Sequence, residues 1–117
     1  MKLMSRDISP QQQQELKQLQ IMSQNLQVLQ QNRIQMEATL TDTSKAIEAI
    51  KDLADDAEVY RLSGQLFYKS EVPKTREKLI EEKELLEVRV NSMKKQFEDL
   101  EKRAMDLEAK LKSELGY

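Results

Sequence analysis

The segment ADDAEVYRLSGQLFYKSEV, residues 54–72, decides the fold, because the helical period that runs along the chain on either side stops within it. β-branched and aromatic residues cluster here, and Ser63 and Gly64 offer a two-residue turn. A slip of the strand register would exchange the two faces of the ribbon. We predict a β-hairpin with these opposite pairs: Tyr60 with Phe67, Val59 with Tyr68, and Glu58 with Lys69.

A long helix is predicted before this segment, over about residues 9–54. Ser9 is a good N-cap, and Pro10 suits the first helical position, where a backbone donor is not needed. Apolar positions then alternate in steps of three and four, interrupted only by Arg33 and Thr43. The resulting heptad seam consists of Leu19, Met22, Leu26, Leu29, Arg33, Met36, Leu40, Thr43, Ile47, Ile50 and Ala54.

A second helix is predicted after the segment, over about residues 73–115. It starts just after Pro73 and ends before Gly116, both of which suit those positions. Charged residues fall mostly outside its heptad positions, which gives solvated faces. Its seam consists of Leu79, Lys83, Leu86, Val90, Met93, Phe97, Leu100, Ala104, Leu107 and Leu111.

The fold class that follows is dominated by α-helix: a long antiparallel two-helix coiled coil with one inserted β-hairpin. A connection this short returns the second helix beside the first, so the seams of both helices are paired. Two Gly and two Pro in 117 residues, with 34% charged residues, fit one elongated helical unit. We expect one domain over residues 1–117, with both termini at one pole and the hairpin region, about 55–72, at the other.

Two polar residues interrupt the first seam. Arg33 and Thr43 could fix the register or mark a narrow gap, but an arginine can also keep its stem in a seam and extend its charged head to solvent. The Gln-rich stretch between Gln11 and Gln35 is interpreted as a solvated helix face, because glutamine is a good helix former.

Composition argues against several classes of function. His and Cys are absent, so the usual general base and the best nucleophile are missing, and we expect no enzyme, catalytic residue or cofactor. Asp55 and Asp56 are more plausible as turn or capping residues than as metal ligands. A net charge of −2 with interleaved bases does not favour nucleic acid. No segment has the apolar length of a membrane span or a signal peptide, so no membrane partner is expected. The lack of Cys fits a reducing cytoplasm.

The hairpin pole is predicted to be an assembly surface. An isolated two-stranded ribbon is marginal in water and leaves two edges unpaired, so such edges are normally paired or covered. This ribbon carries apolar side chains on both faces, more than it can bury by itself. The alternative is that the hairpin folds back on its own helices.

The terminal pole carries apolar side chains that could contact a partner adaptably: Leu3, Met4, Ile8, Leu16, Leu115 and Tyr117. Apolar residues near helix ends are also ordinary.

The order of these parts, together with DDAEVYRLSGQLFYKS at Asp55–Ser70, resembles prefoldin subunits of the β class. The resemblance spans nearly the whole chain. Its most specific part is Asp-Asp-Ala-Glu-Val-Tyr, followed by Gly64 and by an apolar run that ends at Lys69. One hairpin implies the β class, because α-class subunits carry a second hairpin and a longer central linker.

The resemblance implies a hexamer of two α-class and four β-class subunits, in which the hairpins form a double β-barrel platform. It further implies that the coiled-coil tips hold non-native client proteins without ATP and deliver them to a cytosolic group II chaperonin. The assembly residues would be Val59, Tyr60, Leu62, Gly64, Leu66, Phe67 and Tyr68. The client-binding residues would be Leu3, Met4, Ile8, Leu16, Leu111, Leu115 and Tyr117.

A structural or tethering coiled-coil protein that dimerises through its heptad seams is the alternative. The two hypotheses differ at the hairpin, because a tether has no need for the aromatic β segment, whereas a platform requires it.

Overall fold

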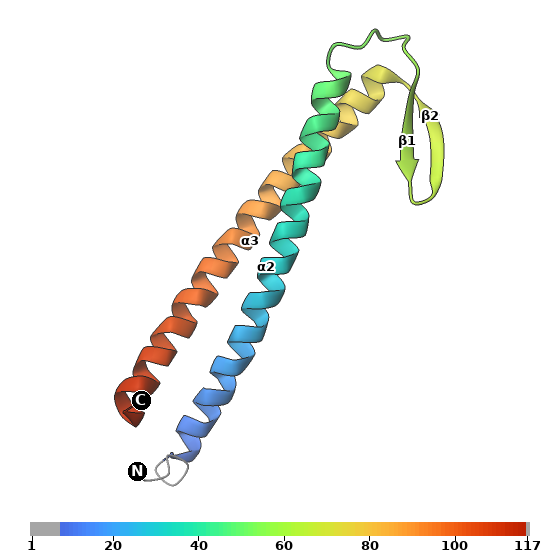
Figure 1. The fold of residues 1–117 in the computed structure, drawn as a ribbon. Helices are drawn as coiled ribbons and strands as arrows, with labels where there is room; N and C mark the ends of the chain where they lie inside the picture. The colour runs from blue at the N-terminus through green and yellow to red at the C-terminus, as the bar shows by residue number, and fades with distance from the viewer. Residues whose placement is uncertain (1–7, 117) are drawn as a thin grey trace. The chain divides into compact units, whose positions relative to one another are not determined.

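The computed structural model describes residues 8–116 and contains two long helices with one hairpin between them (Figure 1). Helix α2 spans Pro10–Ile50, and helix α3 spans Val72–Leu115. Strands β1, Val59–Ser63, and β2, Leu66–Ser70, form an antiparallel two-stranded sheet. This arrangement confirms the predicted fold class.

Helix α2 starts with a reciprocal capping pair. The backbone N–H of Gln12 donates to Ser9 Oγ at 3.0 Å, and the backbone N–H of Ser9 donates to Gln12 Oε1 at 3.0 Å. Pro10 occupies the first helical position. The Ser-x-x-Gln spacing thus satisfies two backbone donors at the point where the helix begins.

Helix α2 ends at Ile50, rather than near residue 54. The Arg76 side chain of α3 donates from Nη2 to the carbonyl oxygens of Ile50 and Leu53, at 3.3 Å each. The last carbonyls of a helix have no partner within the helix, so an arginine from a neighbouring helix can satisfy them. Ala54, expected as the last seam position, is exposed in the turns that follow.

Helix α3 begins at Val72, which places Pro73 inside the first turn, where its missing donor costs nothing. At the other end, Gly116 has a φ of 76°, and its N–H donates to the Lys112 carbonyl at 2.9 Å. A glycine with positive φ directly after the last helical residue is the common way to end a helix. The predicted stop at Gly116 is therefore confirmed.

The predicted seams are the covered faces of the helices. From Leu19 to Ile50 and from Leu79 to Leu111, every predicted seam residue is buried or half-buried. Thr43 is buried, and its hydroxyl donates to the Thr39 carbonyl at 2.9 Å, which satisfies the hydroxyl without a partner from another element. The guanidinium of Arg33 lies 5.7 Å from the centre of the Phe97 ring and donates to Gln30 Oε1 at 3.0 Å. Arg33 thus adds a cation–π contact to the seam.

The chain divides into two compact units. One contains the chain up to Arg33 and from Ser92 onward; the other is Ile34–Asn91. In the first, the start of α2 lies beside the end of α3, as ion pairs and hydrogen bonds between them show. In the second, a small core consists of Ile50, Val72 and Leu79, with Ala46, Ile47, Ala57 and Val59 packed against it.

The hairpin exists where it was predicted, but its register differs. Leu62 pairs with Phe67 and Tyr60 pairs with Lys69, so Gly64 and Gln65 form the turn. The prediction that Tyr60 lies directly opposite Phe67 is wrong. Relative to the prediction, each β1 residue pairs with a β2 residue two positions further along the chain. A shift of two keeps every side chain on its predicted face. The predicted ion pair between Lys69 and Glu58 is present at 3.8 Å, now as a diagonal pair.

Within residues 8–116, neither helix has a stretch that is long and apolar enough to cross a membrane.

Candidate functional site

The two faces of the hairpin have different surroundings. Residues directly opposite in an antiparallel pair lie on the same face, so the register assigns each side chain. Val59, Arg61, Tyr68 and Ser70 share one face, which we call the inner hairpin face. Tyr60, Leu62 and Phe67 share the other face with Lys69, and we call these three apolar residues the outer hairpin face.

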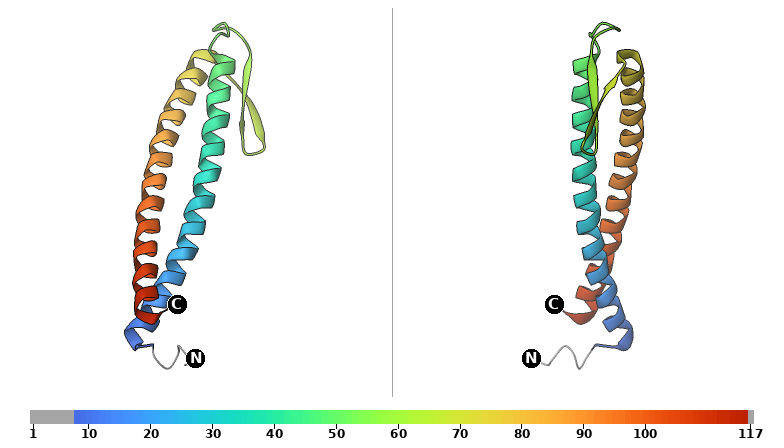
Figure 2. Two further views of the ribbon diagram at one scale, coloured as in Figure 1. Left: turned by 60° about the vertical axis from the view of Figure 1, so that its left-hand side comes forward. Right: turned by 90° about the vertical axis from the view of Figure 1, so that its right-hand side faces the viewer.

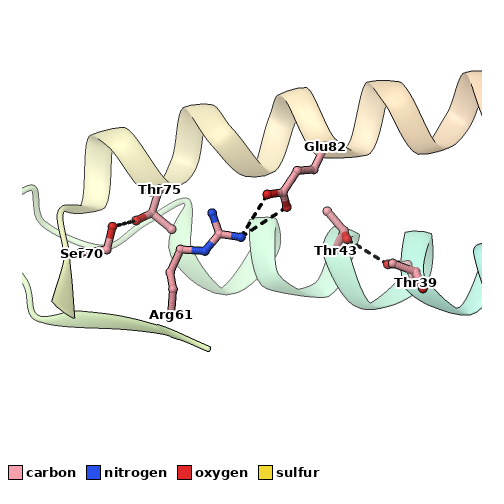
Figure 3. Close-up of polar contacts among 6 residues, drawn as sticks. All are labelled: Thr39, Thr43, Arg61, Ser70, Thr75 and Glu82. Carbon is pink, nitrogen blue, oxygen red and sulfur yellow. Dashed lines mark hydrogen bonds and ion pairs between the residues drawn. The ribbon is translucent and has the colours of Figure 1, made fainter. Parts of the chain in front are cut away.

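The inner hairpin face is tied to the helices of its own unit, beside which the hairpin lies (Figure 2). Arg61 Nη2 donates to the Glu82 carboxylate of α3, at 3.1 Å to Oε1 and 3.4 Å to Oε2 (Figure 3). The hydroxyls of Ser70 and Thr75 lie 2.7 Å apart in the same view. Val59 packs against the core. The hairpin therefore folds back on its helices, as the sequence left open, but with one face only.

The outer hairpin face is left uncovered. Tyr60 is 59% exposed, Leu62 58% and Phe67 70%. These values are high for three apolar side chains on one short ribbon, and contiguous exposed apolar surface is typical of an interaction site. Leu66 and Tyr68, two further predicted assembly residues, lie on the side of the inner hairpin face by register, but they are also exposed, near the turn and along β2.

Both edges of the ribbon are open, because the sheet in residues 8–116 has only two strands. The unpaired N–H and C=O groups along such edges can pair with a strand of another chain. The exposed outer hairpin face and the open edges are thus available to the same partner.

Gly64 determines where the hairpin turns. Its φ is +60°, and no non-glycine residue among those described has a positive φ. A two-residue turn with a positive φ at its first central position is of the II′ type, which takes glycine there. A turn at Ser63 and Gly64 would instead place Ser63 at the position that needs glycine. This requirement explains the one-residue shift of the turn.

The predicted client-binding residues fall into three groups. Leu3, Met4 and Tyr117 lie outside the described residues. Ile8, Leu16 and Leu115 are half-buried, and the last two lie where the first turns of α2 meet the last turns of α3. Leu111 is fully buried in the seam. Leu111 therefore packs within the seam and is not accessible to a client as long as the last turns of α3 stay folded against α2.

Two polar contacts join α2 and α3 at this end, and neither was predicted. Lys110 Nζ lies 2.6 Å from Glu15 Oε2, and Gln12 Nε2 donates to Glu114 Oε1 at 3.0 Å. The hydrogen bond to Glu15 raises the pKa of the Lys110 ammonium above its ordinary value. The partners are about a hundred residues apart in sequence. They could have been predicted only by aligning the two heptad seams antiparallel and comparing the residues that flank them.

Two arginines whose contacts hold the hairpin end together were also not predicted from the sequence. Arg61 reaches Glu82, and Arg76 reaches the end of α2 and lies 3.9 Å from Asp55. Both contacts link segments about twenty residues apart that come together only in the folded unit. Among residues 8–116, no group of three or more His, Cys, Asp or Glu side chains could hold a metal ion.

Comparison with known proteins agrees with this geometry. Residues 13–117 match the family model described as prefoldin subunit. The chain is 39% identical to the prefoldin subunit beta of Methanococcoides burtonii, over 97% of each chain. It is 38% identical to the prefoldin subunit beta of Thermococcus gammatolerans, over 93% of each chain.

A solved structure is also similar. The crystal structure of the prefoldin beta subunit from Thermococcus strain KS-1 superposes with a TM-score of 0.79 at 37% identity, and the match covers 92% of this chain and 95% of that one.

Proposed function

Because the chain belongs to the prefoldin subunit family, we propose that it acts as a β-class subunit of an ATP-independent holdase. In this proposal residues 1–117 work as a single prefoldin-like domain without a cofactor and without a catalytic step. The chain binds unfolded proteins at its coiled-coil tips, and the assembled complex delivers them to a group II chaperonin in the cytoplasm.

One observation carries the proposal: a hairpin whose inner face is tied to its helices presents an exposed apolar outer face and two open edges. The Arg61 and Glu82 ion pair and the packing of Val59 hold the ribbon in place. A ribbon held in this way is presented to a partner without a large loss of conformational freedom on binding. A tether that dimerises through its seams has no use for this surface.

The proposed assembly contains two α-class and four β-class subunits joined through their hairpins. Strands of neighbouring subunits pair at the open edges, and the outer hairpin faces pack together into a shared core. Burying three large apolar side chains per hairpin contributes most of the stabilisation, because apolar burial is worth about 25 cal/mol per Å².

Client capture is proposed at the terminal ends of the helices. Ile8, Leu16 and Leu115 are half-buried there, and Leu3, Met4 and Tyr117 belong to the same segments of sequence. Leu111 contributes only when the last turns of α3 separate from α2. Several weak apolar contacts from several subunits hold one client, so avidity replaces a deep pocket.

The test is co-assembly with an α-class prefoldin subunit in the absence of ATP. We expect a hexamer by sedimentation velocity, and we expect this hexamer to suppress the aggregation of a chemically denatured client protein. A mixture that neither co-assembles nor protects the client would overturn the proposal and favour the tether.

A further inference from the structure

A basic hollow of about 300 Å³ lies between the hairpin and the start of α3. Four cationic side chains line it, against a single carboxylate, that of Glu71. Most of the lining comes from β2 and the first two turns of α3. The cationic residues of this basic hollow are Arg61, Lys69, Lys74 and Lys78.

Two of these cations have no partner. Arg61 is engaged with Glu82, and Lys69 has only an exposed pair with Glu58 at 3.8 Å. Lys74 and Lys78 are exposed, and within residues 8–116 neither makes an ion pair or a side-chain hydrogen bond. They lie in the first two turns of α3, where the helix dipole adds positive potential. The hollow therefore carries a local positive charge on a chain whose net charge is −2.

The complementary charge is present on the same chain. The segment that leads into β1 carries Asp55, Asp56 and Glu58, which we call the acidic connection, and all three are exposed. Asp55 has only a distant pair with Arg76 at 3.9 Å, and Asp56 makes no ion pair among the described residues. Within residues 8–116 of one chain, Glu58 has only its exposed pair with Lys69 at 3.8 Å, so the acidic connection makes two long, exposed ion pairs and leaves Asp56 without one.

Strand geometry brings these two charged segments together between chains. Inside the hairpin, Val59 at the start of β1 lies opposite Ser70 at the end of β2. If the β1 of a second copy adds antiparallel to the open edge of β2, its first residue again lies near Ser70. The acidic connection that precedes it then lies beside Lys74 and Lys78. Parallel addition would place the same acids near the turn at Leu66, away from both lysines.

We propose that the basic hollow of one copy of this chain binds the acidic connection of a second copy, whose β1 adds antiparallel to the open edge of β2. This inference rests on the proposed assembly through the hairpin. It adds which edge of the ribbon is paired, that of β2, and that the added strand runs antiparallel to it. Attraction between the charges selects the antiparallel arrangement over the parallel one. Each copy offers one hollow and one connection, so the contact is head-to-tail and leads to closed rings or to chains.

Charge reversal tests the proposal on the isolated full-length chain. We expect the wild type to self-associate in sedimentation velocity and to do so more weakly at high salt, because exposed charges are screened. Lys74→Glu with Lys78→Glu should raise the dissociation constant about tenfold or more, through lost attraction and new repulsion. Carboxylates in the first turns of α3 suit the helix dipole, so the helix itself should be unharmed.

A charge-swap pair makes the test specific. Asp55→Lys with Asp56→Lys should also weaken self-association when alone. Mixing it with the Lys74→Glu, Lys78→Glu chain should restore association, because each hollow then meets an oppositely charged connection. The matched control, Lys94→Glu with Lys102→Glu, changes the net charge equally on exposed positions of α3 and should associate like the wild type.

Three results would overturn the inference: a wild type that stays monomeric at all concentrations, reversed lysines without effect, or a swapped mixture that fails to associate. A parallel experiment with the α-class subunit separates this inference from the proposed function. If the charge-reversed variants still form a hexamer that protects the client, the proposed function stands, and the inference that the open edge of β2 is paired through these charges is wrong.

Discussion

Arg76 caps the end of α2, although it belongs to α3. Its guanidinium bonds two carbonyls in the last turn region of α2, and it lies near Asp55 in the acidic connection. No glycine or proline follows Ile50 closely, so local sequence contains no stop signal there. The carbonyls at this end are therefore satisfied by a side chain from the neighbouring helix and not by a local capping residue.

Replacing Arg76 with alanine should lower the free energy of unfolding by about 1 to 2 kcal/mol, because carbonyls of α2 lose a charged donor. The measurement is chemical denaturation followed by circular dichroism. Arg89→Ala is the matched control, because Arg89 is exposed on the same helix and makes no ion pair or side-chain hydrogen bond within residues 8–116. Equal stability of the two variants would rule out the capping role.

The Lys110 and Glu15 pair predicts a pH dependence confined to alkaline solution. The hydrogen bond raises the pKa of Lys110 above 10.5, so its stabilising effect is complete below that pH and is lost as the pH rises through the raised pKa. Glu15→Gln should lower the pKa of Lys110, as measured by an NMR titration of its side chain. An unchanged titration in the variant would show that Glu15 does not hold the ammonium.

At the scale of the elements, the hairpin turn depends on one residue. An added Cβ at Gly64 would meet no atom within 4 Å, so the cost of a side chain there is conformational and not steric. Gly64→Ala should therefore destabilise the hairpin by about 1 kcal/mol or more, because a positive φ is unfavourable for alanine. Hydrogen exchange of the β1 and β2 amides is the measurement, with Gln65→Ala as the control. Equal protection in both variants would contradict the assignment of the turn.

The helices and the existence of the hairpin could be predicted because their signals are local. Steps of three and four from Leu19 to Ile50 and from Leu79 to Leu111 define both covered faces, and the structure buries those positions at least partly. The register could not be read from the Ser63–Gly64 pair alone, because the turn type depends on which of its two central residues has a positive φ, and that residue is Gly64 at the first position. Arg61 and Arg76 were missed because their partners are close only after folding.

For the candidate site, as for the fold, the local features could be predicted and the contacts that form only on folding could not. The sequence predicted an apolar hairpin but not which face the helices would hold. Val59 and Arg61 lie on the face that contacts the helices, and Tyr60 and Phe67 lie on the exposed one. The family resemblance implies that Leu111 is a client-binding residue, but in the folded chain its side chain is fully buried. Periodicity places residues on a face, and burial follows from what packs against that face.

In the whole molecule, assembly and client capture are proposed at opposite ends of the helices, so they can be tested separately. Leu115→Ser should leave the hexamer with an α-class subunit intact and weaken client binding by roughly two- to tenfold, since many weak contacts share the load. Light scattering from an aggregating client measures this effect. Val88→Ser is the control, because Val88 is an exposed apolar residue of α3 that is far in sequence from the terminus. If both variants protect the client equally, Leu115 is not a contact.

If the outer hairpin face drives assembly, Phe67→Asp should prevent the chain from joining an α-class subunit, which sedimentation velocity of the mixture measures. Phe67 is 70% exposed, so aspartate should leave the fold of the chain unchanged by circular dichroism. We expect the hexamer peak of the wild-type mixture to be absent with Phe67→Asp, because the substitution places a charge in the shared apolar core. A hexamer that forms as readily as with the wild type would contradict this role of the outer hairpin face.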